Sequence, residues 1–355
     1  MEALGRVSIP VRGHQTLRQV TPDSPAGPER PGGQSVTTPS WRAVPSWGAV
    51  LTALVAQVCV VTLLTGMASA PRHAPAPRHA RAASTAASSA AWVPWNLVWY
   101  DAFSGRAGSG VSTQNWKYDT GQGVFGNNEV EDMTASPSNV HLDGAGNLDI
   151  TALNRSGRWT SGRIQTTQLF TAPAGGELQV VASIKLPDPA GGLGYWPAFW
   201  LLGAGLWPQD GEIDILEDVD TLSEHSGTLH CGNITTPNGD GTYGPCHEYT
   251  GLTSGLRGCS GCLTGYHSYS VVIDRRDASD EHIYWYLDGQ EFFSMSESQV
   301  GARVWTQAVD HGFSIIFDLA MGGNYPNGVC GCTTPTARTT SGGTMSVDHV
   351  GVYRR

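Results

Sequence analysis

The stretch Gly211-Glu212-Ile213-Asp214-Ile215-Leu216-Glu217-Asp218 combines the pattern of a buried strand with acidic side chains. Side chains alternate between the two faces of a β-strand, so Glu212 and Asp214 share one face and the isoleucines between them point into a core. Glu217 breaks this alternation because it lies an odd number of residues after Glu212. A β-bulge adds one residue to a strand and resets the alternation. We therefore predict a bulge near residues 215–216 that brings all three acids to one face.

Three carboxyl groups on one face repel one another and lose solvation, which shifts their pKa values. Cleavage of a glycosidic bond by two carboxyl groups requires one that is protonated and one that is ionised, and such crowding separates the two roles. The motif is preceded by Trp207 and Pro208 and has no adjacent lysine or arginine. The pattern therefore favours an acid/base pair over an exposed strand face whose acids have no role.

The motif resembles the Glu-x-Asp-x-x-Glu motif of glycoside hydrolase family 16. The resemblance implies that Glu212 is the nucleophile and Glu217 the general acid/base, while Asp214 shares a proton and orients its neighbours. Lichenases of the family have a shorter motif on a regular strand, whereas laminarinases, agarases and carrageenases have the extra residue found here. The longer form implies the laminarinase-like branch of endo-β-1,3-glucanases, which need no cofactor for catalysis.

The composition predicts an all-β protein. Only 15% of the 355 residues are charged, whereas glycine (45) and tryptophan (12) are abundant. About a dozen short alternating runs with Gly-rich turns, and no helical period of any length, predict a two-sheet β-jelly-roll sandwich. The family resemblance implies the same concanavalin A-like fold, with a concave sheet that forms the substrate cleft.

Three N-terminal segments precede the predicted domain. Residues 1–46 are polar, basic and Pro-rich, and we expect them to be disordered. Residues 47–70 contain a long apolar run ending in Ala68-Ser69-Ala70, which is typical of a cleaved signal peptide; the alternative is an uncleaved membrane anchor. Residues 71–91 read as an Ala/Pro/Ser linker, and residues 92–355 as one catalytic domain. We expect a secreted protein, or one anchored to a membrane with this domain outside.

Six of the seven cysteines lie in the predicted domain, and an even number after an export signal indicates disulfides. We predict one bridge between Cys231 and Cys246. Cys330 and Cys332 are too close in sequence for an easy mutual bond, so at least one of them should pair elsewhere. The Cys259-x-x-Cys262 motif leaves a metal site open as an alternative, although a second Cys-x-x-Cys pair is missing.

Two tryptophans just before the acidic motif predict a platform for sugar rings. The period of a strand places Trp196, Ala198 and Trp200 on one face. Aromatic rings stack on the apolar faces of pyranose rings, so two tryptophans on one face favour substrate binding over a purely structural role. Laminarinases have a closely similar Trp-Pro-Ala-Phe-Trp segment. Trp207 is expected to form the adjoining rim of the cleft.

Three polar residues complete the predicted substrate contacts. Asn128 lies in a Gly-Asn-Asn-Glu segment that resembles one in laminarinases, although the same residues suit a simple turn. Arg163 resembles an arginine that binds the glucan in the cleft, and the alternative is a surface charge. His230 resembles the cleft histidine of the family, and the alternative is a hydrogen-bonded core histidine. The Gly- and Cys-rich residues 232–265 should form a long loop on the product side of the cleft.

Asp348, in the last predicted strand, matches an aspartate that helps bind a structural calcium on the convex face of laminarinases. The early Asp-Glu-Phe segment of those enzymes is Asp101-Ala102-Phe103 here, which removes one expected ligand unless a backbone carbonyl replaces it.

The net charge of −10, without a basic patch, argues against a nucleic-acid partner. We expect a monomer that acts on a neutral β-glucan, and that contacts a membrane only if residues 47–70 remain uncleaved. Two alternatives stay open: a galactan hydrolase resembling the agarases, and a glucan-binding sandwich without catalysis. Relatives of the second kind typically lose the glutamates, whereas this chain has all three acids.

Overall fold

The computed structural model describes residues 93–123 and 125–355. The segments predicted to be leader, signal or anchor, and linker (residues 1–46, 47–70 and 71–91) lie outside the described residues. Among the helices that are described, none has both the length and the apolar character needed to cross a membrane.

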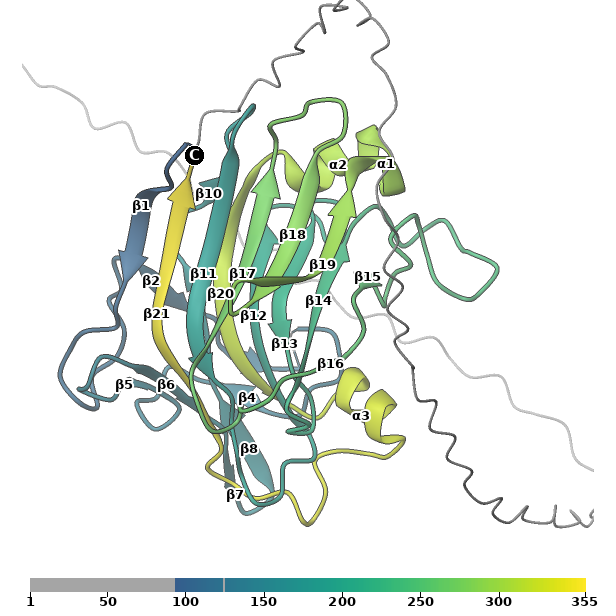
Figure 1. Cartoon of the computed structure of the whole chain (residues 1–355). Coiled ribbons are helices and arrows are strands. Elements are labelled where there is room, and N and C mark those ends of the chain that lie inside the picture. The colour runs from purple at the N-terminus through teal and green to yellow at the C-terminus, as the bar shows by residue number, and fades with distance from the viewer. Residues whose placement is uncertain (1–92, 124) are drawn as a thin grey trace, which may run out of the picture. The chain divides into compact units, whose positions relative to one another are not determined.

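Two large antiparallel sheets face each other and confirm the predicted all-β sandwich (Figure 1). Sheet A contains β19 (Gln290–Ser296), β18 (His282–Leu287), β17 (His267–Asp274), β11 (Glu177–Lys185), β21 (Thr344–Arg354), β6 (Leu148–Thr151) and β5 (Val140–Leu142) in that order, with β1 (Asn96–Asp101) paired to β21. Sheet B contains β15 (Leu252–Thr253), β14 (Glu224–His230), β13 (Glu212–Glu217), β12 (Tyr195–Gly203), β20 (Gly312–Met321), β9 (Arg163–Thr166) and β2 (Trp116–Tyr118), with β10 (Phe170–Thr171) paired to β20 and β16 (Arg257–Gly258) to β14. A small third sheet contains β3 (Gly121–Gln122), β4 (Asp132–Met133), β8 (Arg158–Ser161) and β7 (Leu153–Arg155).

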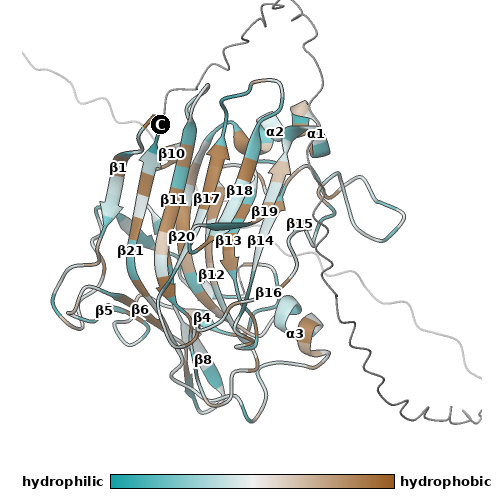
Figure 2. Ribbon diagram, in the orientation of Figure 1, coloured by the Kyte–Doolittle hydropathy of each residue, from teal (hydrophilic) through white to brown (hydrophobic). Residues whose placement is uncertain are grey.

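The core lies between sheets A and B and is built by strand alternation. On β12, Phe199 and Leu201 are buried in the core, and Phe199 stacks on Phe317 of β20 with ring centroids 4.8 Å apart. Figure 2 shows hydrophobic residues along the central strands of the sandwich. The opposite face of sheet B has its own small apolar cluster, formed by Ala198, Trp200, Leu202 and Ile316. Sheet B therefore has one face in the core and one that is free to form a site.

The predicted bulge is present in β13. Asp214 pairs with Trp200 of β12, and Leu216 pairs with Phe199, so Ile215 is the extra residue. The pairing with β14 shifts at the same place. Ile215 and Leu216 are both fully buried, and the alternation restarts so that Glu217 lies opposite Ala198.

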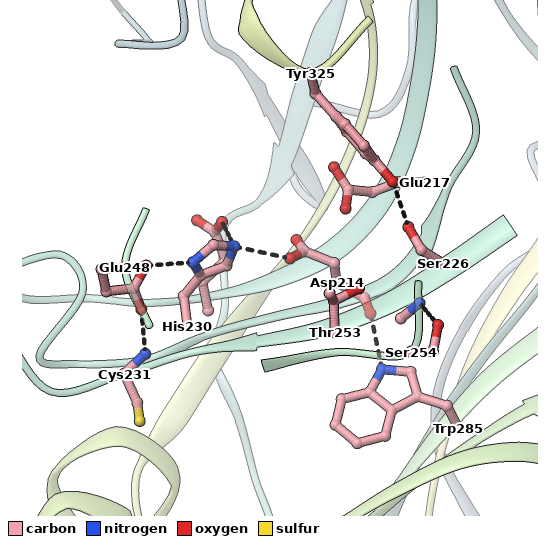
Figure 3. Close-up of polar contacts among 12 residues, drawn as sticks. Asp214, Glu217, Ser226, His230, Cys231, Glu248, Thr253, Ser254, Trp285 and Tyr325 are labelled. Atoms are coloured by element: carbon pink, nitrogen blue, oxygen red, sulfur yellow. Dashed lines mark hydrogen bonds and ion pairs between the residues drawn. The ribbon is translucent and has the colours of Figure 1, made fainter. Parts of the chain in front are cut away.

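The bulge disturbs the strand pairing around Asp214, and sheet A supplies a replacement hydrogen bond. Trp285 of β18 is fully buried, and its indole Nε1 donates to the backbone carbonyl of Asp214 at 2.7 Å (Figure 3). Gly227 of β14 makes room for the indole, because a Cβ at this position would lie 2.6 Å from Trp285 Cδ1. The shape of the bulge thus depends on a donor from the opposite sheet.

Three short helices contradict the expectation that no helix would occur. They are α1 (Glu297–Val300), α2 (Ala302–Val309) and α3 (Asn324–Cys330). In α2 the buried residues Trp305, Ala308 and Val309 follow helical spacing. Two turns are too short for this period to stand out among many alternating strands.

The disulfides confirm one prediction and correct another. Cys231 is bonded to Cys246 as predicted. Cys330 is bonded to Cys332, so the expectation that one of them pairs elsewhere was wrong. Gly331 between them has the left-handed conformation, and this turn brings the two Cα atoms within 5.2 Å, a separation that a disulfide spans.

The Cys259-x-x-Cys262 motif also forms a disulfide. Its sulfurs are bonded to each other and are not free thiolates, so the structure favours the disulfide over the metal-site alternative.

The Trp285→Phe substitution should lower the free energy of unfolding by about 1–3 kcal/mol, because it leaves the buried Asp214 carbonyl without a donor. Urea denaturation of both proteins measures the difference. Trp99→Phe is a matched control, since the half-buried Trp99 ring packs on Trp116 and Phe170 away from β13. An equal decrease in the free energy of unfolding of both variants would show that the hydrogen bond to the bulge does not contribute more than ordinary packing.

Candidate active site

Strand β13 presents its three acids on the free face of sheet B. Glu212, Asp214 and Glu217 lie opposite Leu202, Trp200 and Ala198 of β12, which form the small apolar cluster of that face. Glu212 and Glu217 are partly exposed, whereas Asp214 between them is only 5% exposed. The structure therefore brings together the three residues that the motif predicted.

Asp214 lies at the centre of the group and is the most strongly perturbed acid. Burial raises its pKa well above the ordinary value, and the charges of Glu217 and Glu212 raise it further. Its buried Oδ2 atom accepts no hydrogen bond among the described residues. Asp214 is therefore suited to hold a proton near neutral pH.

Glu217 is held by an indole and keeps its proton near neutrality. Trp196 of β12 donates from Nε1 to Glu217 Oε1 at 3.0 Å. Burial raises the pKa of Glu217 to about 7, although the charge of His230 and the Trp196 hydrogen bond lower it. Trp196 also packs edge-on against Tyr325 of α3, with ring centroids 5.6 Å apart. Tyr325 in turn shares a hydrogen bond with Ser226 of β14 (Figure 3).

His230, at the end of β14, faces carboxyl groups on both sides (Figure 3). Its Nε2 is 3.5 Å from Asp214 Oδ2 and 3.9 Å from Glu212 Oε1, and its Nδ1 is 2.6 Å from Glu248 Oε2. Burial alone would lower the pKa of His230, but the Glu248 hydrogen bond and the charges of Glu212 and Asp214 raise it to about 10. His230 thus lies against the acids of β13, and its raised pKa favours the positively charged form at neutral pH.

Among the three acids, Glu212 is the one whose surroundings most favour the ionised form. Burial raises its pKa, but the positive charges of His230 and Arg163 oppose this effect. The arrangement favours an ionised Glu212 beside a protonated Glu217. This is the pair of protonation states that cleavage of a glycosidic bond by two carboxyl groups requires.

Arg163 lies beside the acids on the free face of sheet B. Its guanidinium covers Trp200, one of the two tryptophans predicted to bind sugar rings. Its guanidinium carbon is 4.6 Å from the Trp200 ring centroid and 4.4 Å from that of Phe125, and its Nε pairs with Asp119 Oδ2 at 3.2 Å. Trp200 is only 9% exposed and donates to Asp318 Oδ1 at 2.7 Å. Trp200 therefore supports Arg163 and Asp318, and Trp196 is the more exposed of the two platform residues.

Trp207 and Asn128, the other two predicted substrate contacts, lie at different places around the site. Trp207 is 38% exposed, lies 5.6 Å from the His230 ring and stacks on Tyr249 at 5.8 Å between centroids. Asn128 is exposed, and its side-chain amide donates to Asn324 Oδ1 at 2.9 Å. This bond ties residues 126–129 to the start of α3.

Three residues of the site were missed by sequence reasoning: Asp318, Tyr325 and Glu248. Asp318 is the single acid in the apolar strand β20, which was a usable signal. Its pKa is raised to about 6 by burial, against the opposing effects of Arg163 and Trp200. Tyr325 and Glu248 lie in a short helix and a loop, where no sequence period marks them.

Asp348, the residue predicted to help bind calcium, lies at the surface of the last strand. Its side chain is 52% exposed and pairs with His349 Nδ1 at 2.5 Å. The Asp101 carboxylate is occupied by hydrogen bonds from Trp116 and Asn115. The described residues contain two clusters with metal-ligand spacing: Cys259, Cys262 and His267; and Glu212, Asp214 and His230. Neither cluster includes Asp348, and the structural calcium site remains a prediction.

Comparisons with known proteins identify the family of this chain. Residues 130–255 match the family described as "XgeA-like, catalytic GH16 domain". The chain is 42% identical to a solved endo-1,3-β-glucanase from Streptomyces sioyaensis, with 75% of this chain and 99% of that chain covered and a TM-score of 0.68. The chain belongs to glycoside hydrolase family 16. Within the family it falls in the laminarinase-like, endo-1,3-β-glucanase branch, and it is therefore a hydrolase.

Two curated relatives support the same branch of family 16. The chain is 32% identical over 286 residues to glucan endo-1,3-beta-glucosidase A1 of Niallia circulans. The match covers 73% of this chain but only 38% of that relative's length. It is also 29% identical over 281 residues to a beta-glucanase of Rhodothermus marinus, covering 73% of this chain and 85% of that protein.

The buried acids of this family 16 enzyme should make it more stable at about pH 5 than at about pH 8. Burial raises the pKa of Glu131 to about 8 and those of Glu217 and Asp218 to about 7. Below the pKa that it has in the unfolded chain, each acid is protonated in both states and does not change the free energy of unfolding. As the pH rises from that value towards the folded pKa, the acid lowers the free energy of unfolding. His230 acts in the same direction, because its stabilisation is lost as pH rises from its ordinary value towards about 10.

Urea denaturation at the two pH values measures this dependence, and equal stability at both would contradict it. Glu131→Gln is the informative variant. Glu131 Oε2 accepts the Met321 N–H at 2.8 Å, and a glutamine oxygen can do the same without ionising. The variant should lose part of the pH dependence.

Proposed function

We propose that the protein is a secreted, retaining endo-glycosidase that hydrolyses internal β-1,3 or mixed β-1,3/1,4 bonds of a β-glucan by double displacement. The observation that carries this proposal is the bulged strand β13, which places Glu212, Asp214 and Glu217 on one face. The Streptomyces and Niallia relatives are an endo-1,3-β-glucanase and a glucan endo-1,3-β-glucosidase, which supports a β-1,3-glucan as the substrate.

In the first displacement, the ionised Glu212 carboxylate attacks the anomeric carbon. Glu217 donates its proton to the leaving oxygen, so the glycosidic bond breaks as an ester to Glu212 forms. The Trp196 hydrogen bond holds Glu217 in place for this transfer. His230 and Arg163 favour the charged form of Glu212 before the attack.

In the second displacement, Glu217 takes a proton from a water molecule that attacks the anomeric carbon and releases Glu212. The enzyme returns to its starting protonation state, and the anomeric configuration is retained. Asp214 lies between the two glutamates, and its buried carboxyl can share a proton with either side of the group as their charges change.

The cellular setting is part of the proposal. The described domain contains three disulfides, which form and persist in oxidising compartments. The apolar run at residues 47–70 supports export, either as a cleaved signal or as an anchor. We propose a monomer that requires no cofactor for the chemical steps and has no nucleic-acid partner.

A reducing-sugar assay on laminarin, lichenan and agarose tests the substrate. We expect the fastest release from laminarin, slower release from lichenan and none from agarose; activity on agarose alone would replace the proposal with a galactan hydrolase. Glu212→Gln should abolish the activity without unfolding the protein, because the amide cannot attack. Glu291→Gln on an exposed position of β19 is the matched control and should behave as wild type.

Glu217→Ala should reduce the rate on laminarin by about 10²–10⁴-fold, because the leaving oxygen loses its proton donor. A β-linked aryl oligoglucoside with a good leaving group needs less help and should be cleaved more nearly at the wild-type rate. Proton NMR of the first products of the wild-type enzyme should show the β-anomer. Initial release of the α-anomer would mean inversion, with water as the direct nucleophile.

A further inference from the structure

Glu248 is a buried carboxylate that the proposed mechanism does not use. It lies in the long loop after β14, with none of its surface exposed. Oε2 is 2.6 Å from His230 Nδ1, and Oε1 accepts the backbone N–H of Cys231 at 2.9 Å (Figure 3). Both oxygens therefore have partners, and the side chain has one defined position.

A disulfide holds this carboxylate against the histidine. Cys231 directly follows His230, and Cys246 lies two residues before Glu248. The bond between the two cysteines closes the loop, so it fixes the start of the Glu248 segment beside the end of β14. The neighbouring Tyr249 stacks on Trp207, which packs against the other side of the site.

The imidazole of His230 has an acceptor at each nitrogen. Glu248 from the loop faces Nδ1, while Glu212 and Asp214 from β13 face Nε2. A neutral imidazole has one N–H and would present a lone pair either to the Glu248 carboxylate or to the side on which the Glu212 carboxylate lies, whereas the imidazolium presents an N–H to both. Arg163 of β9 is the other cation that acts on Glu212.

We propose that Glu248 is a positioning residue for hydrolysis: it orients His230 and keeps it doubly protonated, so that the Nε2–H faces Glu212 and Asp214. This inference rests on the proposed function of those acids. Glu248 touches neither acid, so it acts only through the histidine. Its own negative charge also offsets the charge of the imidazolium, which limits the net charge buried beside the nucleophile.

Two features distinguish this role from structural support alone. The carboxylate could have satisfied the Cys231 N–H with one oxygen, yet its second oxygen lies against the histidine. The opposite nitrogen lies next to the nucleophile. In metal sites, removing a residue that orients a ligand typically costs about 10–100-fold in affinity or activity, and we expect an effect of the same order here.

The test is Glu248→Gln in the full-length protein. A glutamine oxygen can still accept the Cys231 N–H, but its amide group then faces His230 Nδ1 and can only donate. We expect a folded protein whose kcat on laminarin falls by about 10–100-fold with little change in KM. Nitrogen-15 NMR should show that His230 loses a proton at a lower pH than in the wild type, where its pKa is raised to about 10.

Glu248→Asp restores the charge and should recover part of the histidine titration. Glu291→Gln carries the same substitution at an exposed position and should change neither readout. A folded Glu248→Gln protein with either a wild-type kcat or an unchanged His230 titration would overturn the proposal. A residue with only a structural role would lower the melting temperature and leave the titration of the folded protein unchanged.

The histidine titration needs no substrate, so it separates this inference from the proposed function. If the wild type fails to cleave any glucan, the proposed function fails while the titration still tests the Glu248–His230 pair. If Glu248→Gln does not fold, the titration of His230 in the wild-type protein tests the proposal instead. An imidazole that loses its proton near the ordinary value of about 6.5 would then overturn the proposal.

Discussion

One extra residue in one strand determines the arrangement of the whole site. Without Ile215 as the bulged residue, Glu217 would point into the core and the pair of glutamates would not exist. The irregular strand needs support, because its backbone no longer pairs regularly with β14. The Trp285 indole supplies that support from sheet A, and Gly227 leaves room for it. The catalytic geometry is therefore a property of both sheets.

The second constraint is electrostatic. Four acids lie on or near the free face of sheet B, and burial raises the pKa of each of them. Two cations, His230 and Arg163, oppose the effect of burial on the pKa of Glu212. Glu217 has an indole donor, and the charge of His230 acts on it more weakly than burial does. This asymmetry gives two chemically identical side chains different protonation states, which is how one strand can supply both an acid and a nucleophile.

The sequence predicted those parts of the site that lie close together along the chain. The bulge follows from the spacing of Glu212, Asp214 and Glu217, and the shared face of Trp196 and Trp200 follows from strand period. Glu248 and Tyr325 could not be predicted in this way, because they reach the site through a loop and a helix and only the folded chain brings them near His230 and Trp196. Arg163 was expected to bind sugar, but the sequence could not show that its guanidinium would lie on Trp200.

The disulfides also show the limit of predicting structure from sequence spacing alone. The spacing of Cys330 and Cys332 argued against an easy bond between them, but spacing says nothing about a left-handed turn at the residue between them. The family resemblance identified the fold and the branch, which the solved relatives confirm. A long loop at residues 232–265 was expected from composition, but neither the composition nor the resemblance indicated that Glu248 within it would lie against His230.

The hydrogen bond from Trp285 has a practical consequence for protein engineering. Sheet A is the surface that a designer would choose for mutations meant to raise heat resistance, since the three acids of β13 lie on sheet B. Strand β18 of this sheet nevertheless holds the backbone of β13 through the indole of Trp285. Repacking sheet A for tolerance to heat would therefore also change the position of the acids on β13, so a screen should measure turnover together with stability.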